Sequence, residues 1–240
     1  MHDDGFFDAR IAATYDDPSN PDPSPAVDFL SALAGPGPIL ELGIGTGRVA
    51  LPLAARGVKV HGIELSQAMV AKLREKPGGD SIPVTIGDFS TARAEGEFTL
   101  AYLVYNTIMN LTSQEAQIAC FQNVANHLLP GGHFVVEVMV PDLQRLPFGQ
   151  TIRPYHASEN KWDFDEYDIV HQGLISHHSK VVDGVLEQNS IPFRYAWPSE
   201  LDLMAKMAGM NLIGRWDSWN RGPFTNLSEG HVSAWRKVTT

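Results

Sequence analysis

The sequence has one cysteine, Cys120, among 240 residues, and this scarcity excludes an internal disulfide and a cysteine-rich zinc site. It has no apolar run of the roughly 18 residues that cross a membrane, and its start lacks the basic and apolar regions of a secretory signal. Basic residues are also few: 18 Lys and Arg stand against 28 Asp and Glu, giving a formal net charge of −10. That balance disfavours nucleic acid, whose backbone requires clustered cations. We therefore expect a cytoplasmic protein without nucleic-acid or membrane partners.

The length and the 43% hydrophobic content fit one α/β domain over residues 1–240. Strand-like and helix-like patterns alternate along the first part of the chain with short links. This alternation predicts a mostly parallel sheet with helices on both faces. The expected strands are 39–42, 58–64, 82–88, 97–105 and 133–140, and the expected helices between them are 48–56, 66–75 and 113–129.

The pattern changes after residue 140. Residues 150–196 show period-two stretches around Asp183-Gly184, a two-residue hairpin signal. We expect a small antiparallel sheet inserted after strand five, within 141–197, as a cover for the substrate. A helix at 198–209 and strands near 211–219 and 230–238 would complete a seven-stranded Rossmann-like sheet. Residues 1–37 are expected to form an N-terminal helical lid, with short helices at 6–15 and from Ser24.

The segment ILELGIGTGR is the most informative part of the sequence. Gly43, Gly45 and Gly47 follow the first strand at alternate positions, so the backbone can turn sharply and approach a ligand. The next helix directs its first N–H groups to the same place, which favours a bound anion. A glycine-rich turn alone is also compatible with a tight turn that binds nothing.

Acidic residues end the next two strands. Glu64 can accept bonds from both hydroxyls of a ribose, and Asp88 can accept a bond from an adenine amino group. Phe89 follows Asp88 and can flank the adenine ring. Because parallel strands present their carboxyl ends at one edge, these groups are expected to lie near the glycine turn.

ELGIGTGR, IELSQAM and GDF resemble the cofactor signature of class I S-adenosylmethionine-dependent methyltransferases, and LLPGGHFVVEV resembles that family's turn into strand five. The likeness runs from about residue 39 to 140. It implies that S-adenosylmethionine is the cofactor and S-adenosylhomocysteine the product. It also implies roles by position: the methionine moiety at Gly43, Gly45 and Gly47, the ribose at Glu64 beside Leu65, and the adenine at Asp88 and Phe89.

Two further roles follow from the resemblance. Glu41 would orient the glycine turn and the amino group of the cofactor, and Tyr15 would close over the cofactor, although a core role for Tyr15 is equally compatible. The order of elements is similar to that of bacterial tailoring enzymes such as aminosugar N,N-dimethyltransferases. We therefore expect methyl transfer to a nitrogen or oxygen of a small molecule.

Two alternatives remain open at this point. A nicotinamide-dependent reductase also uses a glycine turn and an acid after strand two, but its usual spacing is G-x-G-x-x-G, and here the third glycine comes one position early. A regulatory or non-methylating protein would have the same cofactor pocket. A homodimer is compatible with the sequence.

Residues near the transferred methyl group are expected at the end of strand four and after strand five. Tyr105 and Asn106 are the best placed, with cofactor contact also expected from Tyr105, and His156 is a candidate base. Glu137, within strand five, faces the pocket or pairs with a neighbouring strand. His177 and His178 are adjacent on an expected strand and point to opposite faces, so we expect no shared metal site.

Overall fold

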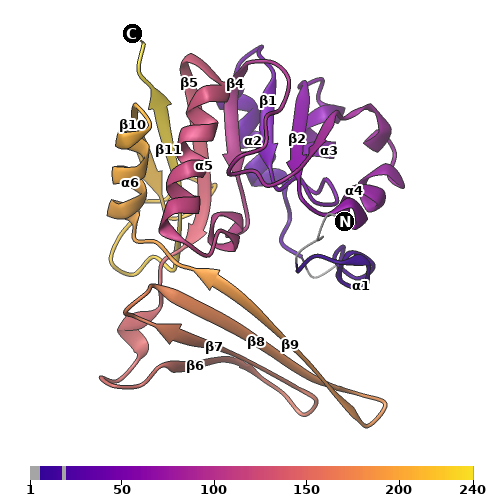
Figure 1. The fold of residues 1–240 in the computed structure, drawn as a ribbon, viewed down its shortest axis with the longest axis vertical. Helices are drawn as coiled ribbons and strands as arrows, with labels where there is room; N and C mark the ends of the chain where they lie inside the picture. Colours follow the sequence, from indigo (N-terminus) through magenta and orange to yellow (C-terminus); the bar gives the residue numbers. More distant parts are fainter. Residues whose placement is uncertain (1–5, 18–19, 240) are drawn as a thin grey trace.

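The computed structural model describes residues 6–17 and 20–239. Its main body is a seven-stranded sheet of order β10-β11-β5-β4-β1-β2-β3 (Figure 1). Strands β1 to β5 run parallel to one another, and β11 runs antiparallel to both β5 and β10. This confirms the predicted Rossmann-like, mostly parallel sheet. Its strands are β1 (Ile39–Leu42), β2 (Val60–Glu64), β3 (Val84–Ile86), β4 (Phe98–Leu103), β5 (Leu128–Met139), β10 (Met210–Trp216) and β11 (Gly230–Lys237).

Helices cover both faces of this sheet because its buried strands alternate apolar side chains between the two sides. Leu100 and Tyr102 of β4 pack on one side, and Ala101 and Leu103 pack on the other. The first side is covered by α2 (Ser24–Ala34), α3 (Ala50–Ala55) and α4 (Gln67–Arg74), and the second by α5 (Gln114–His127) and α6 (Pro198–Met207).

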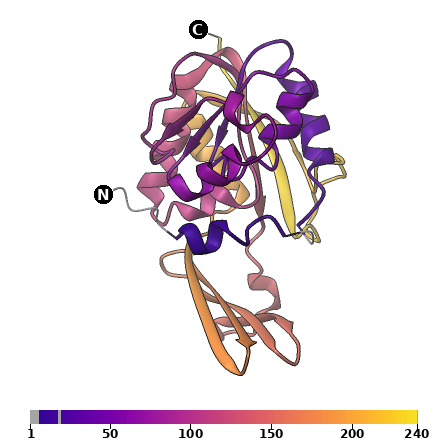
Figure 2. The same cartoon turned by 90° about the vertical axis from the view of Figure 1, so that its right-hand side faces the viewer.

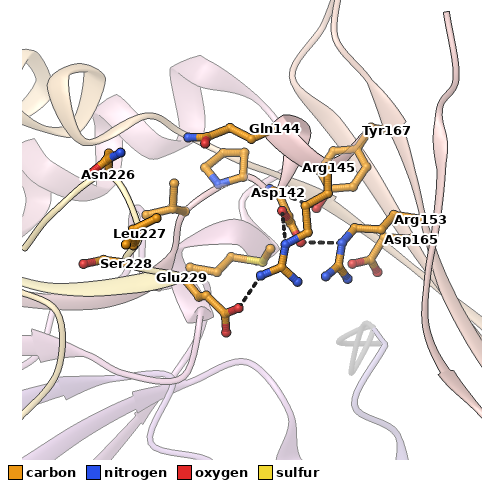
Figure 3. Close-up of a pocket in the computed structure, with 13 residues that line it drawn as sticks. Asp142, Gln144, Arg145, Arg153, Asp165, Tyr167, Asn226, Leu227, Ser228 and Glu229 are labelled. Carbon is orange, nitrogen blue, oxygen red and sulfur yellow. Dashed lines mark hydrogen bonds and ion pairs between the residues drawn. The ribbon is translucent and has the colours of Figure 1, made fainter. Parts of the chain in front are cut away.

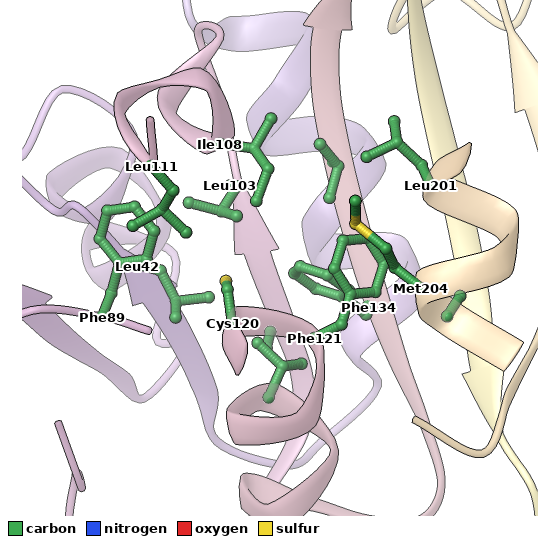
Figure 4. Close-up of a cluster of buried hydrophobic side chains, with 14 of the residues drawn as sticks. Leu42, Phe89, Leu103, Ile108, Leu111, Cys120, Phe121, Phe134, Leu201 and Met204 are labelled. Carbon is green, nitrogen blue, oxygen red and sulfur yellow. The ribbon is translucent and has the colours of Figure 1, made fainter. Parts of the chain in front are cut away.

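Aromatic rings fill the core under α5 and α6, as Figure 4 shows. Phe121 meets Phe134 edge to face at a centroid distance of 5.0 Å and Trp235 at 5.6 Å. Cys120 is fully buried beside them, and burial raises the pKa of its thiol. The cysteine therefore packs as a small apolar group and is not a nucleophile.

A separate four-stranded antiparallel sheet follows β5, as predicted (Figures 1 and 2). Asp183 and Gly184 connect its longest strands with φ values of 51° and 77°, the left-handed pair that a tight hairpin requires. The sheet projects from the end of the main body where β5 finishes, at the lower end in Figure 1. Its strands are β6 (Ile152–Ala157), β7 (Lys161–Asp168), β8 (Gly173–Val182) and β9 (Val185–Arg194).

A buried polar cluster fixes the base of this sheet to the helices. Arg194, at the end of β9, donates to Glu200 of α6 at 2.7 Å and to Gln117 of α5 at 2.5 Å. The side chains of Arg194 and Glu200 are only 6% and 15% exposed. The inserted sheet is thus tied to both helices of one face by charge-assisted hydrogen bonds.

Some predicted boundaries were wrong. The helix predicted at 6–15 is the single turn α1 (Ala9–Ala12), capped by the Asp8 carboxylate, because so short a segment has little helical stability of its own. Strand β5 was predicted to begin at residue 133 but begins at Leu128, before the Leu-Pro-Gly-Gly segment. Leu128 is already paired with Phe98 of β4. Residues 1–5 and 18–19 of the predicted lid lie outside the described residues. The described residues also include three short 3₁₀ helices: η1 (Gly79–Ser81), η2 (Thr107–Asn110) and η3 (Leu143–Arg145).

None of the helices in the described ranges has the length and apolar character needed to cross a bilayer.

Candidate cofactor and acceptor site

The glycine turn after β1 adopts a conformation that only glycine accepts easily. Gly43, Gly45 and Gly47 have φ values of 69°, 55° and 81°. A Cβ on Gly43 would also lie 2.7 Å from the Cγ2 atom of Thr107, so a side chain there would force Thr107 to move. The turn therefore leaves its backbone open to a ligand at the carboxyl end of β1.

Glu64, the last residue of β2, holds this turn in place. Its Oε2 atom accepts the N–H of Gly45 and its Oε1 atom accepts the N–H of Ser66, both at 2.9 Å. The side chain is 7% exposed. Each carboxylate oxygen has two lone pairs, so both can accept a ligand hydroxyl while keeping the backbone bond. The neighbouring Leu65 is 37% exposed beside it.

Glu41 lies under the turn and is 2% exposed. Burial raises the pKa of its carboxyl to about 8, although the Tyr102 hydroxyl, which donates to Oε2 at 2.8 Å, and the charge of Arg48 both act to lower it. A carboxyl in this state gains most from a cation placed beside it. The ammonium of an amino-acid moiety is such a cation.

Tyr15 faces the same region from the N-terminal segment. Burial raises the pKa of its hydroxyl, and Tyr15 lines one cavity together with Tyr105 and with Arg48, the residue after the glycine turn. The segment is tied down by Asp16, which accepts from the Thr46 hydroxyl at 2.7 Å and pairs with Lys76 at 2.7 Å.

Arg48 ends the ILELGIGTGR segment, and no role was predicted for it from the sequence. Its guanidinium lies 4.5 Å from the ring centroid of Tyr105 and donates to the Pro21 carbonyl at 2.9 Å. It provides a cation beside the glycine turn, where a ligand carboxylate can be bound. The cavity here measures about 380 Å³ and is lined by Ile11, Thr14, Tyr15, Asp17, Asn20, Arg48, Tyr105 and His178.

Asp88 and Phe89 follow β3 but differ in exposure. Asp88 is exposed and accepts the N–H of Ser90 at 2.8 Å, so its carboxylate is available at the edge of the sheet. The Phe89 ring is 8% exposed and packs in the core under α5, near Gly43. Their contacts with an adenine remain a prediction.

The backbone after β4 is strained at Tyr105 and Asn106, which have φ values of 59° and 62°. Glu137 of β5 holds it there: Oε2 accepts the N–H of Tyr105 at 2.8 Å, and Oε1 accepts the indole N–H of Trp219 at 2.7 Å. The Asn106 side chain accepts the N–H of Met139 at 2.7 Å. Two roles were predicted for Glu137, to face the pocket or to pair with a neighbouring strand. The structure shows its carboxylate hydrogen-bonded to neighbouring segments of the chain.

A second cavity of about 190 Å³ opens between this turn and the four-stranded sheet. Asp165 of β7 lines it, and burial raises the pKa of that carboxyl, although a hydrogen bond with Ser176 and the charge of Arg153 act to lower it. Asp165 and Met139 also line an adjoining cavity of about 440 Å³, where Arg145 bonds Glu229 and Arg153 pairs with Asp142 (Figure 3). The smaller cavity is lined by Asn106, Met109, Met139, Tyr155, Asp165, Leu174, Ser176 and Phe193.

His156 does not join this group. It is exposed on the edge strand β6, and it is not among the described side chains that line these cavities. His178, in contrast, lines the cavity that contains Tyr15 and Tyr105. The regular alternation of side chains along β8 could have indicated from the sequence that His177 and His178 face opposite sides of the sheet. Within the described ranges, no three His, Cys, Asp or Glu side chains gather to hold a metal ion.

Comparison with known proteins identifies the chemistry. A methyltransferase-domain family matches residues 39–132. The solved structure of the CcbJ methyltransferase from Streptomyces caelestis is 36% identical, with a TM-score of 0.88 over 98% of this chain and 99% of that one.

The chain belongs to the class I S-adenosylmethionine-dependent methyltransferases.

Two other methyltransferases resemble this chain at greater distance, the first in sequence and the second in fold. The cypemycin N-terminal methyltransferase of a Streptomyces species is 26% identical over 195 residues, which is 79% of each chain. The S-adenosylmethionine-bound CalS10, an amino pentose methyltransferase from Micromonospora echinaspora, shares the fold with a TM-score of 0.69, 19% identity and coverage of 99% and 100%. The methyltransferase therefore uses S-adenosylmethionine, and the reductase alternative is set aside.

The residues of this methyltransferase fit that cofactor on structural grounds. Glu41, whose carboxyl a neighbouring cation would favour in its charged form, and the cationic Arg48 complement an amino-acid moiety, and Glu64 has hydrogen-bond capacity for a ribose. The open glycine turn lies between them.

Proposed function

We propose that this methyltransferase transfers the methyl group of S-adenosylmethionine to an amine nitrogen of a small molecule bound between the ends of β4 and β5 and the inner face of the four-stranded sheet. The observation that carries this proposal is the carboxyl of Asp165, the acidic group that lines an otherwise mostly apolar cavity together with Asn106. A desolvated carboxyl recruits a cation, and a protonated amine is the cation that a methyl acceptor supplies.

The relatives support a nitrogen acceptor. One is named for methylating a peptide N-terminus and another for methylating an amino pentose. Both names describe amines, although the two acceptors differ in size and in the rest of their chemistry. We extend only this shared feature to the present enzyme.

We assign the cofactor contacts residue by residue. Gly43, Gly45 and Gly47 would hold the methionine moiety through their backbone, with Arg48 on its carboxylate and Glu41 on its ammonium. Glu64 would hold the ribose, with Leu65 beside it, and Asp88 would hold the adenine, with Phe89 next to it. Tyr15 would cover the cofactor from the N-terminal segment.

The bound cofactor supplies an activated methyl group on a sulfonium, so the protein needs mainly to position the acceptor and exclude water. Orientation of two reactants contributes about 7–11 kcal/mol in favourable cases. Tyr105 and Asn106 would lie between the cofactor and the acceptor, and Glu137 holds the backbone of Tyr105 in place. Residues 141–197 would cover the acceptor, and residues 1–37 would cover the cofactor.

The acceptor class is tested with matched pairs of probes and labelled S-adenosylmethionine. Glucosamine is paired with glucose, and a peptide with a free N-terminal alanine is paired with its N-acetylated form. We expect methyl transfer to nitrogen of a free-amine probe and none to its amine-free partner. Methylation of glucose, or of neither amine, would contradict a nitrogen acceptor.

The role of Asp165 is tested by Asp165→Asn. We expect at least a tenfold higher KM for the amine, since a charged bond contributes about 1.5–3 kcal/mol, with unchanged affinity for S-adenosylhomocysteine. Glu166→Gln is the control, because Glu166 is the next residue on β7 and points to the other face, where it lies 3.4 Å from His177. An equal effect of both substitutions would refute the assignment.

A further inference from the structure

Two adjacent histidines of β8 have different surroundings. His177 lies on the outer face of the four-stranded sheet, stacked on Phe164 with ring centroids 4.6 Å apart and bonded to Ser190 at 2.9 Å. His178 points to the inner face and lines the cavity that contains Tyr15 and Tyr105. Of the pair, His178 alone faces the proposed cofactor site.

His178 also borders the proposed acceptor cavity. Its Nδ1 atom lies 3.3 Å from the Tyr155 hydroxyl, and its Nε2 atom lies 3.3 Å from the Ser176 hydroxyl. Tyr155 and Ser176 both line the cavity that contains Asp165. His178 is therefore at the boundary between the two cavities, where donor and acceptor would meet.

A buried carboxylate lies behind His178. Asp163 is directly opposite His178 in the β7–β8 register and is 3% exposed. Its Oδ2 atom pairs with Lys161 at 3.0 Å, whereas its Oδ1 atom has no hydrogen-bond donor among the described residues. The nearest charged partner recorded for Oδ1 is His178 Nδ1 at 3.4 Å. A proton on that nitrogen would give the buried oxygen a donor and a counter-charge.

We propose that His178 accepts the proton that the protonated amine must lose before methyl transfer, and that Asp163 stabilises the resulting imidazolium. This proposal rests on the proposed amine acceptor. An N–H bond of the ammonium breaks and its proton moves to His178. The freed lone pair forms the N–C bond, the C–S bond breaks with its electron pair left on sulfur, and the imidazolium then loses its proton to solvent.

Such a base matters because amines are mostly protonated at neutral pH. Aliphatic amino groups have pKa values of about 8 to 10.4, so about a tenth or less of the acceptor carries a free lone pair at pH 7. An ammonium cannot attack a methyl group. A positioned base typically contributes 10²- to 10⁴-fold to such a step.

The charges around His178 come from several elements. On the sheet, Lys161 is paired with Asp163 and Lys180 is paired with Glu187. Asp163 is the anion in contact with the imidazole. The other charged or titratable side chains that line the cavities around His178 are Arg10, Tyr15, Asp17, Arg48, Tyr105, Tyr155 and Asp165.

The test compares His178→Gln with His177→Gln, using glucosamine and S-adenosylmethionine. At pH 7 we expect His178→Gln to reduce kcat at least tenfold and His177→Gln to stay within twofold of wild type. The His178→Gln deficit should shrink as the pH rises above the pKa of the amine, because a free amine needs no base. Added imidazole should restore part of the activity at pH 7.

A second readout does not depend on turnover. In enzyme labelled with ¹³C in the histidine rings and bound to S-adenosylhomocysteine, the His178 signal is assigned by its loss in His178→Gln. Adding glucosamine should move this signal to the imidazolium position and leave the His177 signal in place. Asp163→Asn should abolish the movement.

The outcomes separate the two proposals. Methyl transfer by the wild type with equal activity of His178→Gln, or a His178 ring that stays neutral when glucosamine binds, overturns the role of His178 and leaves the amine acceptor standing. A deficit in His178→Gln that is constant with pH also overturns it, because that pattern indicates a structural role. Absence of amine methylation by the wild type overturns both.

Discussion

The carboxylate of Glu64 accepts the backbone N–H of Gly45 at 2.9 Å, joining the end of β2 to the turn after β1. Its other oxygen accepts the N–H of Ser66, so both oxygens already serve the protein. Glu64 therefore shapes the glycine turn in addition to the ribose contact that we propose for it. Two functions in one side chain make the position unusually intolerant of change.

Glu64→Gln tests this double role. A carboxamide presents one acceptor and one donor, so its NH₂ would face one of two backbone N–H groups. We expect at least a tenfold loss of affinity for S-adenosylhomocysteine, nearly as large as for Glu64→Ala, together with a lower Tm. Calorimetric titration and thermal unfolding measure the two effects. If Glu64→Gln bound the ligand as well as wild type, the carboxylate would not be needed at this position.

Glu41 predicts a dependence of stability on pH. An unfolded Glu41 titrates near 4.5 and the folded one near 8, so between these values the folded state binds more protons and its stability falls as the pH rises. Each unit of difference in pKa corresponds to about 1.4 kcal/mol. Glu41→Gln keeps an acceptor for Tyr102 and removes the ionisation.

We therefore expect the Tm of Glu41→Gln, relative to wild type, to rise between pH 5 and pH 8.5 in the ligand-free protein. The comparison of two pH values cancels any effect of the substitution that does not involve ionisation. A Tm difference that is the same at both values would show that Glu41 is already charged in the folded state.

Replacement of Glu137 is expected to reduce activity without weakening cofactor binding. Its two oxygens hold the N–H of Tyr105 and the indole of Trp219, and Glu137→Gln leaves one acceptor for two donors. The strained turn after β4 should relax, so kcat should fall about tenfold or more while affinity for S-adenosylhomocysteine changes less than threefold. Trp219→Phe removes one donor only and should have a smaller effect. Equal effects on kcat and on affinity would argue against a positioning role.

Arg194 is expected to stabilise the junction between the inserted sheet and the helices, so its replacement should lower the free energy of unfolding. Arg194→Met leaves the partly buried carboxylate of Glu200 without its counter-charge, while the amide donors Gln114 and Gln172 remain, so we expect a cost of about 1–3 kcal/mol. Urea unfolding should show a loss of this order. Arg56→Met is the control: Arg56 pairs with Asp28 at the surface, where such pairs contribute about 1 kcal/mol or less. Similar losses for both would contradict the assignment.

The parts of the fold that were predictable from sequence depend on local patterns. The glycine turn, the acid after β2 and the Asp183-Gly184 hairpin each carry a conformational or chemical requirement within a few residues. Apolar alternation was enough to predict the main sheet. The length of α1 was not predictable in this way, because one helical turn is stabilised only by contacts with the rest of the protein.

The acceptor side depends on contacts between distant residues. Glu137 pairs with Trp219, 82 positions away, and nothing near either residue indicates the other. His156 lies beyond an irregularity in the β6–β7 register, which removes any parity argument for its direction. His178 was within reach of the sequence, since its alternation with His177 is regular, but the inner face of β8 became known only from the position of the sheet.

The central claim is that the pocket around the glycine turn binds S-adenosylmethionine through Glu64. The most direct measurement is calorimetric titration of the wild type and Glu64→Gln with S-adenosylmethionine, S-adenosylhomocysteine and NADPH. The account predicts micromolar binding of both adenosyl ligands to the wild type, at least tenfold weaker binding to the variant, and no binding of NADPH. Equal binding to both proteins, or binding of NADPH alone, would contradict it.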